Sequence, residues 1–427
     1  GNAQVSASDT VLTMRQYVQR LADDALAELF NELPAVSVVG PRACGKTTTA
    51  ARLVPNIVHL DAEDTARVFH ENPDAALKAV GEPVVLDEWQ RTPEVLGAVK
   101  RAVDSGQGTG RFLLTGSAEL PLTTKQWPGT GRVVDLRMYG LTVREQLGRL
   151  GGPGFIDRLA TGNVEQLQPA GSWSESPDIT GYLALALRSG FPEATTLTSE
   201  RARLAWLSGY VDHLVQRDIF ATGTSVDQAR LRAYFEALAL YSASVPQAKT
   251  VYDAAGVSRK TAMTYDDVLS RLYVLDLVPA WASNRSKRLV KAPKRYLVDP
   301  ALVTTALQSD VPGIVRDGRL LGALIDTFVA SQIRPEIALA LPRPRMFHWR
   351  DQSGREVDIV IELPGGRVAG IEVKAAASAT RTDAKHLAYL RDQLGDRFVI
   401  GLVLYAGPMT IDWGDRLAAA PISTLWA

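Results

Sequence analysis

Residues 40–47 combine glycine, lysine and threonine at the spacing GxxxxGK[ST], which is typical of a loop that binds nucleotide phosphates. The glycines let backbone N–H groups wrap the β-phosphate, Lys46 can reach the β- and γ-phosphate oxygens, and the Thr47 hydroxyl can ligate Mg²⁺. The loop follows the apolar run AVSVV and precedes TTTAARLV, which can form a helix with its N-terminus towards the phosphates. The residues expected to bind ATP and Mg²⁺ are Gly40, Pro41, Arg42, Ala43, Cys44, Gly45, Lys46, Thr47, Thr48 and Asp87, with Thr47 and Asp87 at the metal.

Two acidic residues, Asp87 and Glu88, follow the apolar run VVL at the end of a predicted strand. Asp87 can hold the Mg²⁺ shell, and Glu88 can polarise the attacking water, unless the pair only faces solvent. The next apolar run, RFLLTGS, ends in Thr115 and Ser117. Thr115 could contact the γ-phosphate and orient water, or it could simply cap its strand.

An arginine after this run could stabilise the charge that develops on the transferred phosphoryl group. Arg132 is the candidate, because a planar guanidinium with a fixed charge suits this role. Arg137 competes for the role, and either could be an ordinary surface arginine. If Arg132 acts on the nucleotide of a neighbouring subunit, the protein must be a homo-oligomer.

The elements that must position these residues alternate between strand and helix patterns as far as about residue 147. Helices are expected at 12–33, 65–80 and 93–106, and strands at AVSVV, NIVHLD, PVVLDE and RFLLTGS. This alternation favours an α/β fold with a parallel sheet flanked by helices. The composition GGPG, TGN and PAGSWSESPD at 148–180 indicates a loop, linker or insertion, and helices are expected from 181 to 245.

Composition argues against a secreted or membrane-spanning protein. The 427 residues carry 47 Lys plus Arg against 47 Asp plus Glu, so the overall charge does not indicate nucleic acid and any basic surface must be local. Cys44 is the single cysteine, no basic-then-apolar signal pattern opens the chain, and no apolar run reaches the length of a membrane span. A cytoplasmic protein is therefore expected. Cys44 could be a redox switch, because its thiol lies in the loop, or only a small residue that fits.

Residues 251–278 predict two helices joined at Gly256–Ser258, with Ser258 capping the second. Such a pair is typical of a helix-turn-helix, and a predicted basic hairpin follows it without an acidic residue from 277 to 298. DNA phosphates could contact this winged-helix-like module, unless it is a lid used only for packing. The candidate DNA-binding residues are Arg259, Lys260, Arg285, Lys287, Arg288, Lys291, Lys294 and Arg295.

The segments GREVDIVIE and VAGIEVK place Asp358, Glu372 and Lys374 on two predicted strands. Glu372 and Lys374 are two residues apart and share a strand face, so two carboxylates and a lysine could bind Mg²⁺ beside a phosphodiester. This pattern resembles the PD-(D/E)xK nuclease core, in which Asp326 would be a further acidic residue on a helix. The domain could be an active nuclease, a relic that only binds DNA, or a structural element.

Several segments together resemble a family of bacterial and archaeal AAA-type (AAA+) ATPases whose ATPase core precedes a C-terminal domain of unknown function. They are GPRACGKTT, VVLDEWQRTPEVLGAVKRAVD, GRFLLTGSAE, GTGRVVDL, SGFPEA, GYVDHLVQRDI, LLGALIDTFVASQI, HWRDQSGREVDIVIE and GIEVK. The resemblance covers nearly the whole chain and departs from the family at 121–130 and 151–180. It implies an ATPase core at 1–150, a linker and helical lid at 151–245, a winged-helix-like module at 246–305 and a nuclease-like domain at 306–427.

These observations predict an ATPase in which Glu88, Lys46, Thr115 and Arg132 take part in hydrolysis. ATP hydrolysis is expected to be coupled to the binding or remodelling of DNA, in particular branched or broken DNA. Two alternatives remain: a signalling or regulatory switch that moves no DNA, and a nucleotide-gated DNA-binding protein that does no mechanical work.

Overall fold

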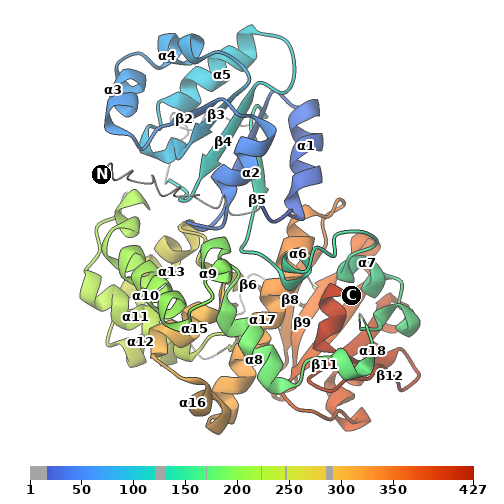
Figure 1. Ribbon diagram of the computed structural model, residues 1–427. Coiled ribbons are helices and arrows are strands. Elements are labelled where there is room, and N and C mark those ends of the chain that lie inside the picture. The colour runs from blue at the N-terminus through green and yellow to red at the C-terminus, as the bar shows by residue number, and fades with distance from the viewer. Residues whose placement is uncertain (1–16, 121–130, 170, 223, 246–247, 285–291) are drawn as a thin grey trace, which may run out of the picture.

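The structure is a computed structural model that describes residues 17–120, 131–169, 171–222, 224–245, 248–284 and 292–427. Three regions follow one another along the chain: an α/β region with the phosphate-binding loop, a helical middle region, and a second α/β region at the C-terminus (Figure 1). No helix within these described ranges is long and apolar enough to cross a membrane.

The first region is built on a five-stranded parallel sheet in the order β2-β3-β4-β1-β5. The strands are β1 (Ala35–Val39), β2 (Ile57–His59), β3 (Val84–Asp87), β4 (Phe112–Gly116) and β5 (Val134–Arg137). The first four confirm the strands predicted from the apolar runs. The edge strand β5 was missed, because its first two residues are exposed and it lacks a long apolar run.

The helices of this region are α1 (Ala22–Glu32), α2 (Lys46–Leu53), α3 (Glu63–Glu71), α4 (Pro73–Val80), α5 (Val95–Ser105) and α6 (Val143–Gln146). The prediction of one helix over 12–33 is wrong for residues 17–21, because the chain there carries Arg20 into contact with the phosphate-binding loop. The predicted helix 65–80 is interrupted at Pro73, where the Asn72 side chain accepts a hydrogen bond from Ala75 N and caps a new helix.

The middle region is helical and contains a two-stranded antiparallel sheet. Its elements are α8 (Ile179–Arg188), α9 (Pro192–Thr196), α10 (Glu200–Gln216), α11 (Gln228–Leu240), α12 (Ala248–Ala255), α13 (Arg259–Arg271), β6 (Leu275–Val278), β7 (Lys294–Leu297), α15 (Pro300–Leu307) and α16 (Val311–Arg316). The helix pair α12–α13 and the β6–β7 pairing agree with the predicted helix-turn-helix and hairpin.

The C-terminal region has a six-stranded mixed sheet in the order β12-β13-β11-β10-β9-β8, in contact with the long helix α17 (Gly318–Leu339) and with α18 (Lys385–Leu394). The strands are β8 (Arg345–Arg350), β9 (Glu356–Glu362), β10 (Val368–Lys374), β11 (Phe398–Tyr405), β12 (Ile411–Asp412) and β13 (Leu417–Pro421). The three strands predicted here, β9, β10 and β11, are all present.

Residues 151–180 are not a free linker. They contain α7 (Phe155–Ala160) and two 3₁₀ turns, and they pack on the C-terminal region. Arg158 donates a hydrogen bond of 2.6 Å to the carbonyl of Thr424, and the Thr424 hydroxyl donates one of 2.8 Å to the carbonyl of Leu167. The glycine- and serine-rich composition suggested a loop, but its few apolar residues are enough to anchor it.

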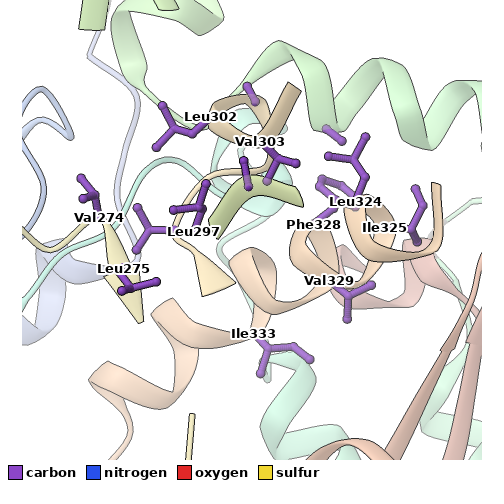
Figure 2. Packing of buried hydrophobic residues seen from close by; sticks show 14 of the residues in the cluster. Val274, Leu275, Leu297, Leu302, Val303, Leu324, Ile325, Phe328, Val329 and Ile333 are labelled. Atoms are coloured by element: carbon purple, nitrogen blue, oxygen red, sulfur yellow. The ribbon is translucent and has the colours of Figure 1, made fainter. Parts of the chain in front are cut away.

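One hydrophobic core continues from the middle region into the C-terminal region. It joins side chains of β6, β7, α15 and α17, such as Leu275, Leu297, Leu302 and Phe328 (Figure 2). The first sheet packs against two other hydrophobic clusters, one on each of its faces. The middle and C-terminal regions are therefore held together by apolar packing.

Candidate active site

The phosphate-binding loop leaves β1 at Val39 and enters α2 at Lys46, as the sequence predicts. Gly45 has a φ of 100°, which favours glycine, and a Cβ at Gly40 would lie 2.2 Å from the carbonyl oxygen of Met138. Lys46 is buried, and its ammonium donates a hydrogen bond of 2.8 Å to the carbonyl of Pro41. Cys44 is fully buried in a core cluster, which agrees with the interpretation that it is a small residue that fits.

Asp87 lies beside this loop and accepts hydrogen bonds from three side chains. Thr47 Oγ1 is 2.7 Å and Thr115 Oγ1 is 2.5 Å from Asp87 Oδ1, and His59 Nδ1 is 3.0 Å from Asp87 Oδ2. The predicted metal ligands, Thr47 and Asp87, are therefore in contact. A hydroxyl and a carboxylate are the hard oxygen donors that Mg²⁺ prefers, so these residues fit the metal.

Glu88 follows Asp87 with a φ of 56°, a left-handed conformation that is uncommon outside glycine. Its carboxylate accepts a hydrogen bond of 2.6 Å from the Ser117 hydroxyl and another from the Gln90 amide. The Thr115 hydroxyl, fully buried, accepts from the backbone N–H of Glu88 at 3.2 Å while it donates to Asp87. Thr115 thus supports both acidic residues, and its contact with the γ-phosphate stays a prediction.

Arg20 was missed by sequence reasoning, although it holds the loop from behind. Its buried guanidinium donates to the carbonyls of Cys44 and Tyr139, each at 2.7 Å, and pairs with Glu145 at 3.0 Å. The sequence pattern placed Arg20 inside the predicted helix 12–33, with no sign of a contact with the loop. Its partners lie up to 125 residues away, and no local pattern identifies them.

The middle region contacts the loop directly. Arg42 in the loop forms an ion pair with Asp218, and the Tyr210 hydroxyl donates a hydrogen bond of 3.2 Å to the carbonyl of Arg42. Burial lowers the pKa of Arg42, but the charge and the hydrogen bond of Asp218, with smaller contributions from Glu88 and Tyr210, together raise it. Arg42 therefore lies within electrostatic reach of both the middle region and the expected catalytic carboxylate.

The two candidate arginines lie at opposite ends of the edge strand β5. Arg132 precedes β5 and pairs with Asp104 at 2.9 Å, at the amino ends of the strands and away from the loop of its own subunit. Arg137 ends β5 beside the loop, but its side chain is only partly exposed and its guanidinium is 2.7 Å from Asp276 of the middle region. Asp276 also pairs with Arg334 of α17. Arg137 thus connects the first and middle regions, and its competing role at the phosphate stays a prediction.

The nuclease-like residues converge only in part. Lys294, from β7, has its ammonium 2.6 Å from Asp326 Oδ2 and 3.3 Å from Asp358 Oδ1. Burial, and then the charge of Asp358, raises the pKa of Glu372 well above its ordinary value, so this third carboxyl lies in the same cluster. Lys374 is directed elsewhere and pairs with Asp383 at 2.6 Å.

A buried ammonium therefore lies between two of the carboxylates that were expected to bind a divalent cation. Among the described residues, no group of three or more His, Cys, Asp or Glu side chains is arranged to hold a metal ion. Asp326, Asp358, Glu372 and Lys374 do not come together in this structure as a predicted metal site would require, because Lys294 pairs with Asp326 and Asp358 and Lys374 pairs with Asp383. Hydrolysis at these residues stays a prediction.

The candidate DNA-binding residues fall into three groups. Arg259 and Lys260 are exposed at the start of α13, whose N-cap Ser258 accepts from Thr261 N at 3.2 Å. Lys294 and Arg295 are buried and paired with Asp326 and Asp266, so the prediction that they contact DNA is wrong. The remaining four, Arg285, Lys287, Arg288 and Lys291, lie outside the described residues.

Comparison with known proteins matches all three regions. Residues 32–147 match a family described as an AAA domain, and residues 179–312 and 321–425 match two domains of unknown function, DUF8612 and DUF4143. The chain is similar to the uncharacterized proteins Rv2008c of Mycobacterium tuberculosis and Mb2031c of Mycobacterium bovis. Each is 28% identical over 427 residues, with 98% of this chain and 87% of the relative covered.

Among solved structures, the Walker-type ATPase PABY2304 of Pyrococcus abyssi is 14% identical, with a TM-score of 0.37. The match covers 66% of this chain and 94% of that one. The AAA match covers the loop, the acidic pair and the five-stranded sheet. The chain therefore carries an N-terminal AAA ATPase domain that is followed by two domains of unknown function.

Proposed function

We propose that the protein is an ATP-driven switch, in which hydrolysis at the AAA domain changes how the middle and C-terminal regions contact it. The observation that carries the proposal is the direct attachment of the phosphate-binding loop to the middle region by Arg42, Asp218 and Tyr210. A change of nucleotide at this loop has to alter contacts with the middle region.

The chain's own residues divide the chemistry between them. Lys46 would bind the β- and γ-phosphates, the hydroxyl of Thr47 and the carboxylate of Asp87 would hold Mg²⁺, and Glu88 would accept a proton from the attacking water. Bound Mg²⁺ supplies charge neutralisation at the phosphate oxygens. Ser117 and Gln90 orient the carboxylate of Glu88, and they keep it fixed beside the end of β4.

A second connection runs through Asp276. It pairs with Arg137 of the AAA domain and Arg334 of α17, so one carboxylate joins all three regions. These two charges outweigh burial and lower the pKa of Asp276, which keeps it ionised. Removing one partner of such a buried ion pair strongly destabilises a protein. The pairs of Asp276 with Arg137 and Arg334 are therefore suited to keep the three regions in contact while the Arg42–Asp218 contact changes.

Asp218→Asn should uncouple the middle region from the nucleotide. Hydrogen exchange of the wild type should show that ATP changes the protection of α10, and the variant should lose most of this change while it still hydrolyses ATP. Couplings between sites are commonly about 1–3 kcal/mol, or about 5- to 150-fold. Asp212→Asn is the control, because its partner Arg232 lies within the middle region. Equal nucleotide-dependent protection in Asp218→Asn and wild type would refute the coupling.

DNA binding is a second candidate, favoured by the exposed positions of Arg259 and Lys260 at the start of α13. Replacing both with alanine should weaken binding to many duplex sequences alike. It should also reduce the slope of log affinity against log salt by about 1.8, since each phosphate contact contributes about 0.9. The paired variant Lys100→Ala with Arg101→Ala, on α5 of the AAA domain, is the control. Unchanged affinity and slope would leave only the residues between 285 and 291 as candidates for DNA contact.

Homo-oligomerisation is a further part of the proposal. Arg132 lies at the amino ends of the strands, whereas the phosphate-binding loop of its own subunit lies at their carboxyl ends. Its side chain is partly exposed beside Asp104. It can therefore act as an arginine finger only on the nucleotide of a neighbouring subunit.

A further inference from the structure

His59 stands at the edge of the AAA sheet, next to the carboxylate that is expected to hold Mg²⁺. It ends β2, the outermost strand, and pairs in register with Asp87 of β3. Directly paired residues on neighbouring parallel strands point to the same face, so the register itself brings the two side chains together. The imidazole is 56% exposed, whereas the carboxylate is buried.

The hydrogen bond has a defined direction. An ionised carboxylate only accepts, so Nδ1 of His59 carries the hydrogen and donates to Asp87 Oδ2 over 3.0 Å. The other carboxylate oxygen accepts from Thr47 and Thr115. Three donors, from the loop and from the two strands that flank β3, thus determine the orientation of this one carboxylate.

These donors are not equivalent. The Thr47 hydroxyl could bind Mg²⁺ through an oxygen lone pair and still donate its hydrogen to Asp87 Oδ1. Among the described side chains, Thr47 and Thr115 both donate to Oδ1, whereas His59 is the one donor to Oδ2. His59 alone holds Oδ2, and its loss would let the carboxylate rotate.

We infer that His59 is a positioning residue that orients Asp87 for Mg²⁺ in the nucleotide site. This inference rests on the proposed ATPase site and deepens it. Partners that hydrogen-bond to a metal-binding carboxylate commonly contribute about 10- to 100-fold to metal affinity or activity. His59→Ala should therefore raise the Mg²⁺ requirement, and it should leave phosphate contacts with Lys46 and the loop intact.

The experiment measures binding of the full chain to a non-hydrolysable ATP analogue over a series of MgCl₂ concentrations and in EDTA. His59→Ala should need about 10- to 100-fold more Mg²⁺ for the metal-dependent gain in affinity, with unchanged affinity in EDTA. His59→Asn should recover most of the loss, because its amide N–H lies close to the position of Nδ1. His70→Ala should match the wild type, since His70 pairs with Glu94 on the surface of the same domain.

Three outcomes would overturn the inference: a wild-type Mg²⁺ requirement in His59→Ala, an equal loss of affinity in EDTA, or no recovery in His59→Asn. Wild-type binding without any effect of Mg²⁺ would also overturn it. Failure of the proposed hydrolysis is distinguishable, because turnover of ATP by the wild type is measured separately and the binding comparison does not depend on it.

Discussion

Glu88→Gln should bind ATP with nearly the affinity of the wild type and lose about 10²- to 10⁴-fold of its turnover. The amide keeps the size of the side chain and can still contact Ser117, which lies 2.6 Å from the carboxylate in the wild type. It cannot accept a proton from water, so only the chemical step is lost. Single-turnover hydrolysis, together with nucleotide binding measured separately, distinguishes this effect from weaker binding.

Two comparisons sharpen this result. Lys46→Ala should instead lose nucleotide binding, because the phosphate charges lose the ammonium at the loop. Glu94→Gln should turn over ATP like the wild type, since Glu94 pairs with His70 on the surface. Wild-type turnover in Glu88→Gln would refute its role as the base and leave the water without an acceptor at the end of β3.

Lys294→Met should destabilise the protein by about 3–5 kcal/mol, the usual cost of removing one partner from a buried ion pair. Asp326 and Asp358 would then lie close together without the ammonium that neutralises them. Urea unfolding followed by fluorescence measures the change. Lys374→Met is the matched control and should cost less than about 1 kcal/mol, because its pair with Asp383 is more exposed.

The pH dependence of this loss has a definite sign. Burial raises the pKa of Asp326 from 3.8 to about 6, although Lys294 lowers it, so removing Lys294 should raise this pKa further. Between the unfolded and folded pKa values the folded state binds more protons, so stability falls as pH rises. The difference between Lys294→Met and wild type should therefore be smaller at pH 5 than at pH 8. Equal stability of the Lys294→Met and Lys374→Met proteins would show that the cluster is not held by this lysine.

Sequence alone located the nucleotide chemistry because its determinants are local. A loop between a strand and a helix needs glycines, Lys46 and Thr47 at fixed spacing, and the strands of this sheet are apolar runs that are readable residue by residue. The acidic pair was found in the same way, since Asp87 and Glu88 end such a run. The C-terminal strands β9, β10 and β11 also followed from their patterns.

Only the tertiary structure decided which partner each charged side chain has. Lys294 lies in a basic run and was expected to contact DNA, yet β7 pairs with β6 and brings its ammonium to Asp326, 32 residues away. No sequence pattern assigned a role to His59, and it is the register of β2 and β3 that places it beside Asp87. Burial and hydrogen bonding depend on which elements lie side by side, and the balance between desolvation and pairing then determines whether a charge binds a ligand or another part of the chain.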